Sequence, residues 1–188
     1  ILVAAKLLTN EHRDDLIKAI VQLSPYGGTP TAHAYAETGA YMLGMTTKGR
    51  NSNTGSGFDK SNSTSDIKNS NNYKSPFDVL PSPKDECNGQ GIYFLTDGSP
   101  NNSTNSQTLM ARALGLGSSF SNNGGLPSGS SSGNQMSYVG AFSKYLRNTY
   151  NIKTAVVGFG KEFYVDPDED EKKVVNERVI RILQNEKG

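Results

Sequence analysis

Short apolar segments alternate with segments of helical periodicity along this chain. The predicted strands, judged by length and composition, are residues 1–8, 91–96 and 152–159. The predicted helices, in which apolar residues recur every three or four positions, are 11–23, 107–114 and 136–150. Strands that are separated by helices pair in parallel through right-handed crossovers. The alternation therefore predicts an α/β fold with a doubly wound, mostly parallel sheet and helices on both faces.

A further helix with one thin side is predicted between residue 29 and about residue 43. Thr29 and Pro30 are typical of the N-cap and first position of a helix, and Gly44 is typical of its end. Small residues recur along one side of this helix, namely Ala32, Ala36, Gly39 and Ala40. A thin side allows close approach to a sheet, which is how helices pack in α/β layers.

Two segments rich in Ser, Asn and Gly interrupt this pattern. Residues 46–85 are too long and too polar for an ordinary connection, and residues 118–134 have the low complexity of a mobile segment. We therefore expect one domain over residues 1–188 with two polar surface insertions. The apolar residues of the tail at 168–187 have helical spacing, although their β-branching leaves a strand open.

The charge and the cysteine content exclude several classes of protein. The 188 residues include 19 basic and 18 acidic side chains, so no basic excess favours binding to nucleic acid or anionic lipid. No apolar run approaches the roughly 20 residues of a membrane-spanning helix. Cys87 is the single cysteine, which leaves two interpretations open, an unused thiol or a bridge to a segment outside this chain.

Thr29 and Asp97 are the candidate ligands of a metal ion. Thr29 precedes a predicted helix, and Asp97 directly follows the strand predicted at 91–96. Ligands collect outside the carboxyl ends of the strands in a doubly wound sheet, so both residues are expected at one edge. A hydroxyl and a carboxylate are hard oxygen donors that suit Mg²⁺, Ca²⁺ or Mn²⁺. Taken singly, Thr29 is better explained as a helix cap and Asp97 as a turn residue.

Three segments, in this order along the chain, resemble a von Willebrand factor type A domain. They are Gly27-Gly28-Thr29-Pro30 with its Ala-rich helix, the strand and turn at 92–101, and the strand at 153–160. Two runs look more narrowly like the PilC/PilY family of type IV pilus-associated proteins. These runs are Thr-Pro-Thr-Ala-His-Ala-Tyr-Ala-Glu at 29–37 and Gly-Ile-Tyr-Phe-Leu-Thr-Asp-Gly at 91–98.

The resemblance implies a metal-ion-dependent adhesion site. In the family, a first-loop Asp-x-Ser-x-Ser, a second-loop Thr and a third-loop Asp hold a divalent ion. Thr29 matches the second loop and Asp97 the third. Ser99 is an additional candidate, because Asp97 and Ser99 have the outline of the first loop. An ion with few protein carboxylates can still accept an acidic group from a partner.

The first loop is missing from its expected place. The chain resembles the family from its third strand onward, so we expect a fold that is incomplete at the N-terminus and an ion that binds weakly to this piece. The family's first loop is then expected before Ile1. Residues 59–63, Asp-Lys-Ser-Asn-Ser, do spell the motif, but they follow low-complexity sequence instead of a strand. We interpret this run as a chance match.

Other candidate metal ligands have less support. An EF-hand-like spacing, at positions 1, 3, 5 and 12, is formed by Asp166, Asp168, Asp170 and Glu177. Glu171 stands where such a loop needs Gly, and the rigid Pro167 stands at position 2, so an acidic helix start explains the cluster better. His12 and His33 are isolated and are expected to be solvent-exposed or packing residues.

These observations give one expected function and two alternatives. We expect a non-enzymatic, metal-dependent binding domain of a bacterial surface protein, acting in pilus biogenesis and in attachment to host cells or surfaces. Its location is extracellular or at the outer membrane, and its partner is a pilus component or host receptor that offers an acidic group. The alternatives are a Mg²⁺-dependent hydrolase with Asp97 at the strand end, and a scaffold whose metal residues are vestigial.

Overall fold

Two compact units make up the chain, and each is described by itself. The computed structural model describes residues 1–24, 28–49, 55–79, 90–96, 105–117, 120 and 133–158, with the backbone alone at 79 and 133–137. Unit 1 comprises residues 1–28, 33–85 and 104–120, and unit 2 comprises residues 29–32, 86–103 and 121–188. Both units contain helices and strands, so the fold is mixed α/β.

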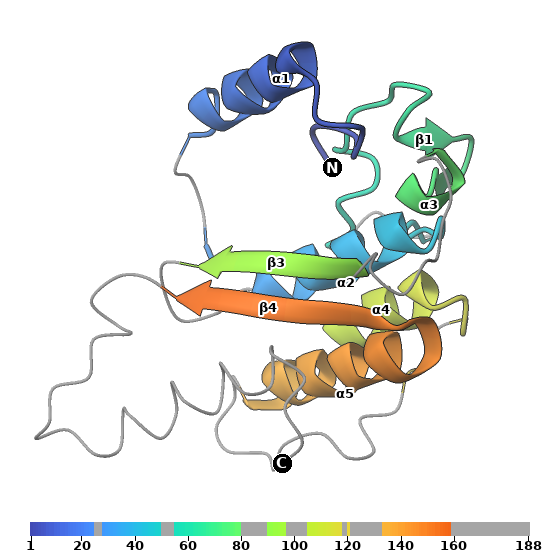
Figure 1. Ribbon diagram of the computed structural model, residues 1–188. Helices are drawn as coiled ribbons and strands as arrows, with labels where there is room; N and C mark the ends of the chain where they lie inside the picture. The colour runs from blue at the N-terminus through green and yellow to red at the C-terminus, as the bar shows by residue number, and fades with distance from the viewer. Residues whose placement is uncertain are drawn as a thin grey trace, which may run out of the picture. The chain divides into compact units, whose positions relative to one another are not determined.

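A parallel pair of strands lies in unit 2 (Figure 1). The strands are β3 (Gln90–Thr96) and β4 (Ile152–Gly158). They pair residue by residue from Gln90 opposite Ile152 to Thr96 opposite Gly158, so their carboxyl ends meet at one edge. The prediction that strands at these positions pair in parallel is confirmed.

The helix α5 (Gly133–Tyr150) packs against β4 (Figure 1). Its fully buried residues Val139, Phe142 and Leu146 are spaced three and four residues apart, as the predicted helix at 136–150 requires. A single residue, Asn151, connects α5 to β4 and adopts the left-handed conformation with φ 54°. Asn tolerates this conformation better than most residues because its short polar side chain can bond locally.

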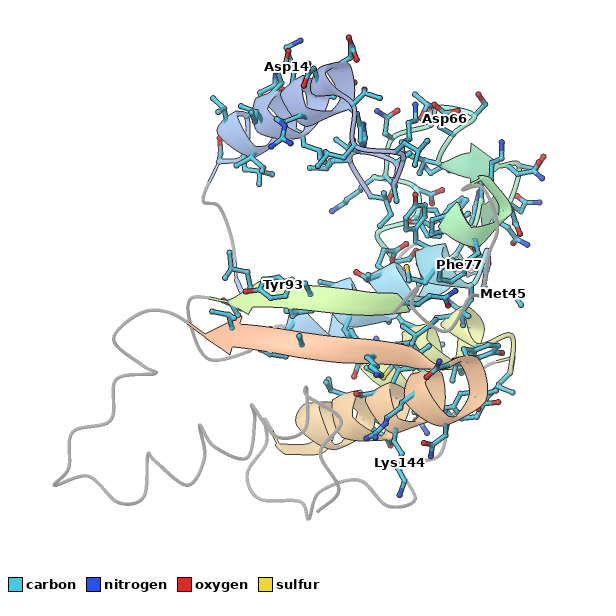
Figure 2. The ribbon with its side chains drawn as sticks, in the orientation of Figure 1. Asp14, Met45, Asp66, Phe77, Tyr93 and Lys144 are labelled. Atoms are coloured by element: carbon cyan, nitrogen blue, oxygen red, sulfur yellow. The ribbon has the colours of Figure 1, made fainter. Side chains whose placement is uncertain are left out.

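The two faces of the strand pair differ in their exposure. Every second residue is buried or partly buried, and the buried ones are Ile92, Thr96, Ile152, Thr154 and Val156. The other face exposes apolar side chains, including Tyr93, which is 68% exposed, and Leu95, which is 60% exposed. Figure 2 shows Tyr93 on the side of β3 that faces away from α5. The described part of unit 2 thus has two strands and one covered face, and the doubly wound sheet remains a prediction.

Unit 1 contains the other predicted helices. They are α1 (Asn10–Val21), most of α2 (Thr31–Met42) and α4 (Ser106–Ala113). The bounds of all three lie within two residues of the predicted bounds. α2 ends at the predicted place because Gly44 adopts φ 65°, a conformation that costs Gly little. Among the helices that the structure describes, none is long and apolar enough to cross a membrane.

Residues 1–8 do not form a strand, which corrects the sequence prediction. Their backbone bonds go to a loop and to a side chain in unit 1. Asn62 N donates to Ile1 O at 2.8 Å, and Ala5 N donates to Tyr41 Oη at 2.8 Å. An apolar run forms a strand only where another strand can hydrogen-bond with its backbone. Within the described ranges, residues 1–8 have no such neighbouring strand.

Residues 55–79 fall within the segment that was predicted to be a polar surface insertion, yet they supply a local core. The elements here are the antiparallel pair β1 (Lys68–Asn69) and β2 (Asn72–Tyr73), and the short helix α3 (Pro76–Val79). The buried apolar side chains of this segment are Phe58, Ile67 and Tyr73. The rings of Phe58 and Tyr73 meet edge to face, with their centroids 4.9 Å apart.

Three further predictions concern residues outside the described ranges. They are the tail at 168–187, Cys87 and most of the polar segment 118–134. Phe120 is a described residue of that segment and is buried. Gln107 Nε2 donates a hydrogen bond of 2.7 Å to the carbonyl oxygen of Phe120, which ties this residue to α4.

Candidate functional site

The carboxyl edge of β3 and β4 is where the sequence predicts the ligand residues. The last paired residues are Thr96 and Gly158, and the Thr96 side chain is buried. The next residue in the sequence is Asp97, which lies outside the described residues, as does Ser99. The structure therefore shows the edge itself and not the acidic ligand.

Thr29 belongs to the same unit as this edge. Residues 29–32 group with β3 and β4 in unit 2, whereas the rest of α2 belongs to unit 1. Thr29 is partly exposed, and its carbonyl oxygen accepts a hydrogen bond of 2.8 Å from Thr31 N. The helix starts at Thr31, so Thr29 stands just before the N-cap position and not in it.

Thr31 is a polar residue of this region that the sequence prediction missed. The residue is 4% exposed, and its Oγ1 is buried with no hydrogen-bond partner among the residues that the structure describes. Leaving a buried hydroxyl unpaired costs about 1–3 kcal/mol. A cation would satisfy this oxygen, because a hydroxyl is a hard donor of the same kind as that of Thr29. The signal in the sequence was the repeated Thr of Thr29-Pro30-Thr31.

The structure brings together only part of the predicted ligand set. The acids of the calcium-loop spacing, Asp166, Asp168, Asp170 and Glu177, lie outside the described residues. Elsewhere in the described ranges, no three His, Cys, Asp or Glu side chains are grouped closely enough to hold a metal ion. Thr29 and Thr31 are thus the members of the candidate site that can be located.

The run at 59–63 that spells Asp-x-Ser-x-Ser makes contacts within unit 1. Ser61 is buried, and its Oγ lies 2.7 Å from Tyr73 Oη and 3.0 Å from Gly57 O. Asp59 is largely exposed, and its Oδ1 lies 3.5 Å from Lys48 Nζ. These contacts are those of a packed turn and a surface ion pair, which agrees with interpreting the run as a chance match.

Glu37 is the centre of a buried polar cluster in unit 1. Its side chain is 7% exposed. Oε2 accepts hydrogen bonds from Thr47 Oγ1 at 2.7 Å and from Gly57 N at 2.8 Å, and Oε1 accepts one from the Tyr73 hydroxyl. A buried carboxylate is tolerated when it is hydrogen-bonded in this way.

Burial and the hydrogen bond to Glu37 raise the pKa of Tyr73 well above its ordinary value. The Tyr73 hydroxyl therefore stays protonated at neutral pH and keeps donating to Glu37. Burial likewise raises the pKa of Tyr41, whose Oη accepts the hydrogen bond from Ala5 N. Because both oxygens of Glu37 accept hydrogen bonds, the cluster ties Thr47, Gly57 and Tyr73 to α2.

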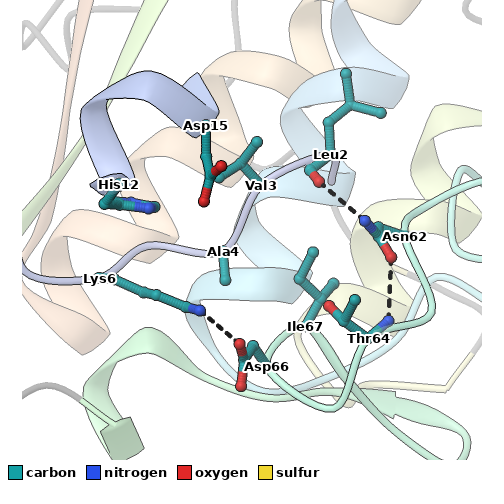
Figure 3. Close-up of a pocket in the computed structure, with 10 residues that line it drawn as sticks. All are labelled: Leu2, Val3, Ala4, Lys6, His12, Asp15, Asn62, Thr64, Asp66 and Ile67. Carbon is teal, nitrogen blue, oxygen red and sulfur yellow. Dashed lines mark hydrogen bonds and ion pairs between the residues drawn. The ribbon is translucent and has the colours of Figure 1, made fainter. Parts of the chain in front are cut away.

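A pocket of about 200 Å³ lies in unit 1 beside the start of α1 (Figure 3). Its apolar lining is Leu2, Val3, Ala4 and Ile67. Its polar lining is Lys6, His12, Asp15, Asn62, Thr64 and Asp66. Lys6 Nζ lies 2.5 Å from Asp66 Oδ2, and this hydrogen-bonded ion pair lowers the pKa of Asp66 and raises that of Lys6.

No protein-family model, curated protein or solved structure matches the chain. The resemblance of this chain to a family therefore rests on the order of the three segments at 27–30, 92–101 and 153–160, and two of these segments contribute the parallel strands β3 and β4.

Proposed function

We propose that this chain is a divalent-cation-dependent binding domain of the von Willebrand A type. It belongs to a bacterial surface protein that resembles PilC/PilY, and it acts outside the cell or at the outer membrane. Its role is in pilus biogenesis and in attachment to host cells or surfaces. Its partner is a pilus component or a receptor that presents an acidic group.

The in-register parallel pairing of β3 and β4 is the observation that carries this proposal. The pair ends with Thr96 opposite Gly158, and Asp97 is the next residue in the sequence. Ligands of α/β sheets bind outside the carboxyl ends of the strands. Thr29 groups with these strands in unit 2, which supports a site shared by two segments far apart in the sequence.

The donor set fits a hard divalent cation. Thr29 and Asp97 contribute a hydroxyl and a carboxylate, and the unpaired hydroxyl of Thr31 is a further oxygen in the same unit. One carboxylate leaves the ion with a net positive charge. Such an ion attracts a carboxylate of a partner, which completes the coordination and joins the two proteins.

Titration of the ¹⁵N-labelled chain with Mn²⁺ tests the proposal, because a bound paramagnetic ion broadens the amide signals of nearby residues. We expect saturable broadening at Thr29, Thr31 and Thr96, and little at Tyr150, which precedes the opposite end of β4. Asp97→Asn should weaken Mn²⁺ binding at least about tenfold, since it removes the charged ligand.

Asp59→Asn is the matched control, because it removes the carboxylate of the chance match at 59–63 and should leave Mn²⁺ binding unchanged. Equal binding by Asp97→Asn and the wild-type chain would refute the site. If Mn²⁺ produces no saturable broadening, and the melting temperature is the same in Mg²⁺, Ca²⁺ and chelator, these results would favour the scaffold alternative, because a ligand of the native state must stabilise it.

A further inference from the structure

The helix α1 turns a polar side toward the rest of unit 1 and an apolar side toward water. His12 is the one buried residue of α1, and it lines the pocket of unit 1 together with Asp15 (Figure 3). Val21 lies nine residues after His12, which at about 100° per residue places it on the opposite side of the helix. A surface helix normally turns its apolar side toward the core. The arrangement in α1 is the reverse.

The exposed side of α1 forms an apolar stripe, which we define as Ile17, Ile20, Val21 and Leu23. The exposed fractions of these residues are 51%, 65%, 77% and 60%, in that order. Ile17 is followed by apolar residues three and four positions later, so these residues share one side of the helix. Leu23 extends the stripe beyond the end of α1, where its N–H donates to Ile20 O at 3.1 Å.

Burial of the apolar stripe would stabilise α1 itself. A helix of 12 residues is marginal in water by itself and depends on the packing of its apolar side. The apolar residues of α1 outside the stripe, Leu16 and Ala19 among them, are only partly buried. The side chain of Thr9 caps the first turn by accepting a hydrogen bond of 3.2 Å from His12 N, but it supports that turn alone. The stripe is therefore the surface through which a second body would stabilise the helix.

We propose that the apolar stripe docks a second copy of this chain, with the two α1 helices packed stripe to stripe across a twofold axis. Such a contact presents the same surface on both copies, so the surface has to be complementary to itself. The stripe meets this condition because it contains no charged side chain, and apolar contacts need no opposite charge on the partner.

The size of the apolar stripe indicates a weak and reversible dimer. Its four side chains expose roughly 300 Å² of apolar surface per copy, at about 30 Å² for each fully exposed side-chain carbon. Because homodimer interfaces are about 65% apolar, this area corresponds to a total interface of about 900 Å². An interface of this size belongs to the transient class, below about 1,200 Å². We therefore expect a dissociation constant above about 10 μM.

Sedimentation equilibrium of the full 188-residue chain, at concentrations from about 10 μM to 1 mM, tests this inference. We expect the apparent mass to rise with concentration from the 20.2 kDa of one chain toward twice that value. Ile20→Lys should raise the dissociation constant at least about tenfold, because it places an ammonium group from each copy in the apolar contact. Ile20 is 65% exposed, so this variant should fold.

Leu95→Lys is the matched control, because Leu95 is 60% exposed and lies on β3, away from the apolar stripe in the sequence. This variant should dimerise as the wild-type chain does. A wild-type chain that stays monomeric up to 1 mM, or equal dimerisation by Ile20→Lys, would overturn the proposal. So would a melting temperature of Ile20→Lys that is several degrees lower at 10 μM, since the stripe would then be covered within one chain. The buffer contains EDTA, so the outcome is independent of the site at Thr29 and Asp97.

Discussion

Glu37 shows how one charged residue can organise a segment that has few apolar side chains. Its carboxylate is buried and accepts hydrogen bonds from Thr47, Gly57 and Tyr73. A Cβ at Gly57 would lie 3.1 Å from Glu37 Oε2, so a larger residue at this position would require the Glu37 side chain to shift by a few tenths of an ångström. The hydrogen bonds offset the cost of removing the carboxylate from water, so each donor becomes part of the stability of unit 1.

The ion pair of Lys6 and Asp66 predicts that the N-terminal segment is anchored in a pH-dependent way. The hydrogen bond and the charge of Lys6 lower the pKa of Asp66 in the folded state below its unfolded value. Such a carboxyl contributes stability that is complete above its ordinary pKa of about 4 and is lost as pH falls through the folded value. We expect Lys6→Met to raise the Asp66 pKa, as measured by NMR titration of its carboxyl carbon.

Lys60→Met provides the control for this titration, since it removes one exposed lysine that does not line the pocket. Asp66 should titrate in this variant as it does in the wild-type chain. The same Asp66 midpoint in Lys6→Met and in the wild-type chain would contradict the ion pair.

At the scale of elements, the two faces of β3 predict that substitution by lysine destabilises the protein strongly on one face and little on the other. Ile92 lies on the buried face, and Ile92→Lys would force an ammonium group into apolar surroundings at a cost of several kcal/mol. Leu95 lies on the exposed face, so Leu95→Lys should change the free energy of unfolding by no more than about 0.5 kcal/mol. Urea unfolding followed by circular dichroism measures both changes. A large loss in Leu95→Lys would show that another layer covers this face.

The elements were predictable where an apolar pattern repeats. In α5, the spacing of Val139, Phe142 and Leu146 reports the buried side of the helix directly. Residues 1–8 were mispredicted because an apolar run does not specify a partner strand. Isolated residues such as Phe58 carry no periodicity among Ser and Asn, so the core of residues 55–79 could not be predicted from the sequence.

The residues of the candidate sites also differ in whether the sequence alone could predict them. Thr29 and Asp97 were found through motifs whose order resembles a family. The burial of the Thr31 hydroxyl and the place of His12 in the pocket lining depend on which distant residues surround them. No local spacing encodes that surrounding, so these groups could be recognised only in the folded chain. The same is true of Glu37, which lies in an Ala-rich helix.

At the scale of the whole molecule, the two compact units predict two unfolding transitions. Tyr73→Phe removes a donor from buried Glu37 and should destabilise unit 1 by about 1–3 kcal/mol. Phe142→Ala leaves a cavity beneath α5 and should destabilise unit 2 by about 3–5 kcal/mol. In differential scanning calorimetry, each variant should lower one transition and leave the other in place. A single transition that both variants shift would instead support the one domain predicted from the sequence.

The connection between α5 and β4 is one residue long, and this shortness has a consequence for how the chain tolerates change. Side chains alternate between the two faces of a strand. Adding or removing one residue at Asn151, with the helix held in place, would turn Lys153, Ala155 and Val157 toward α5 and the present buried set toward water. Inserting two residues would return the present buried side chains to the face that packs against α5. Whether the linker between α5 and β4 has an odd or an even number of residues therefore decides which face of β4 packs against α5. The identity of the linking residue matters less.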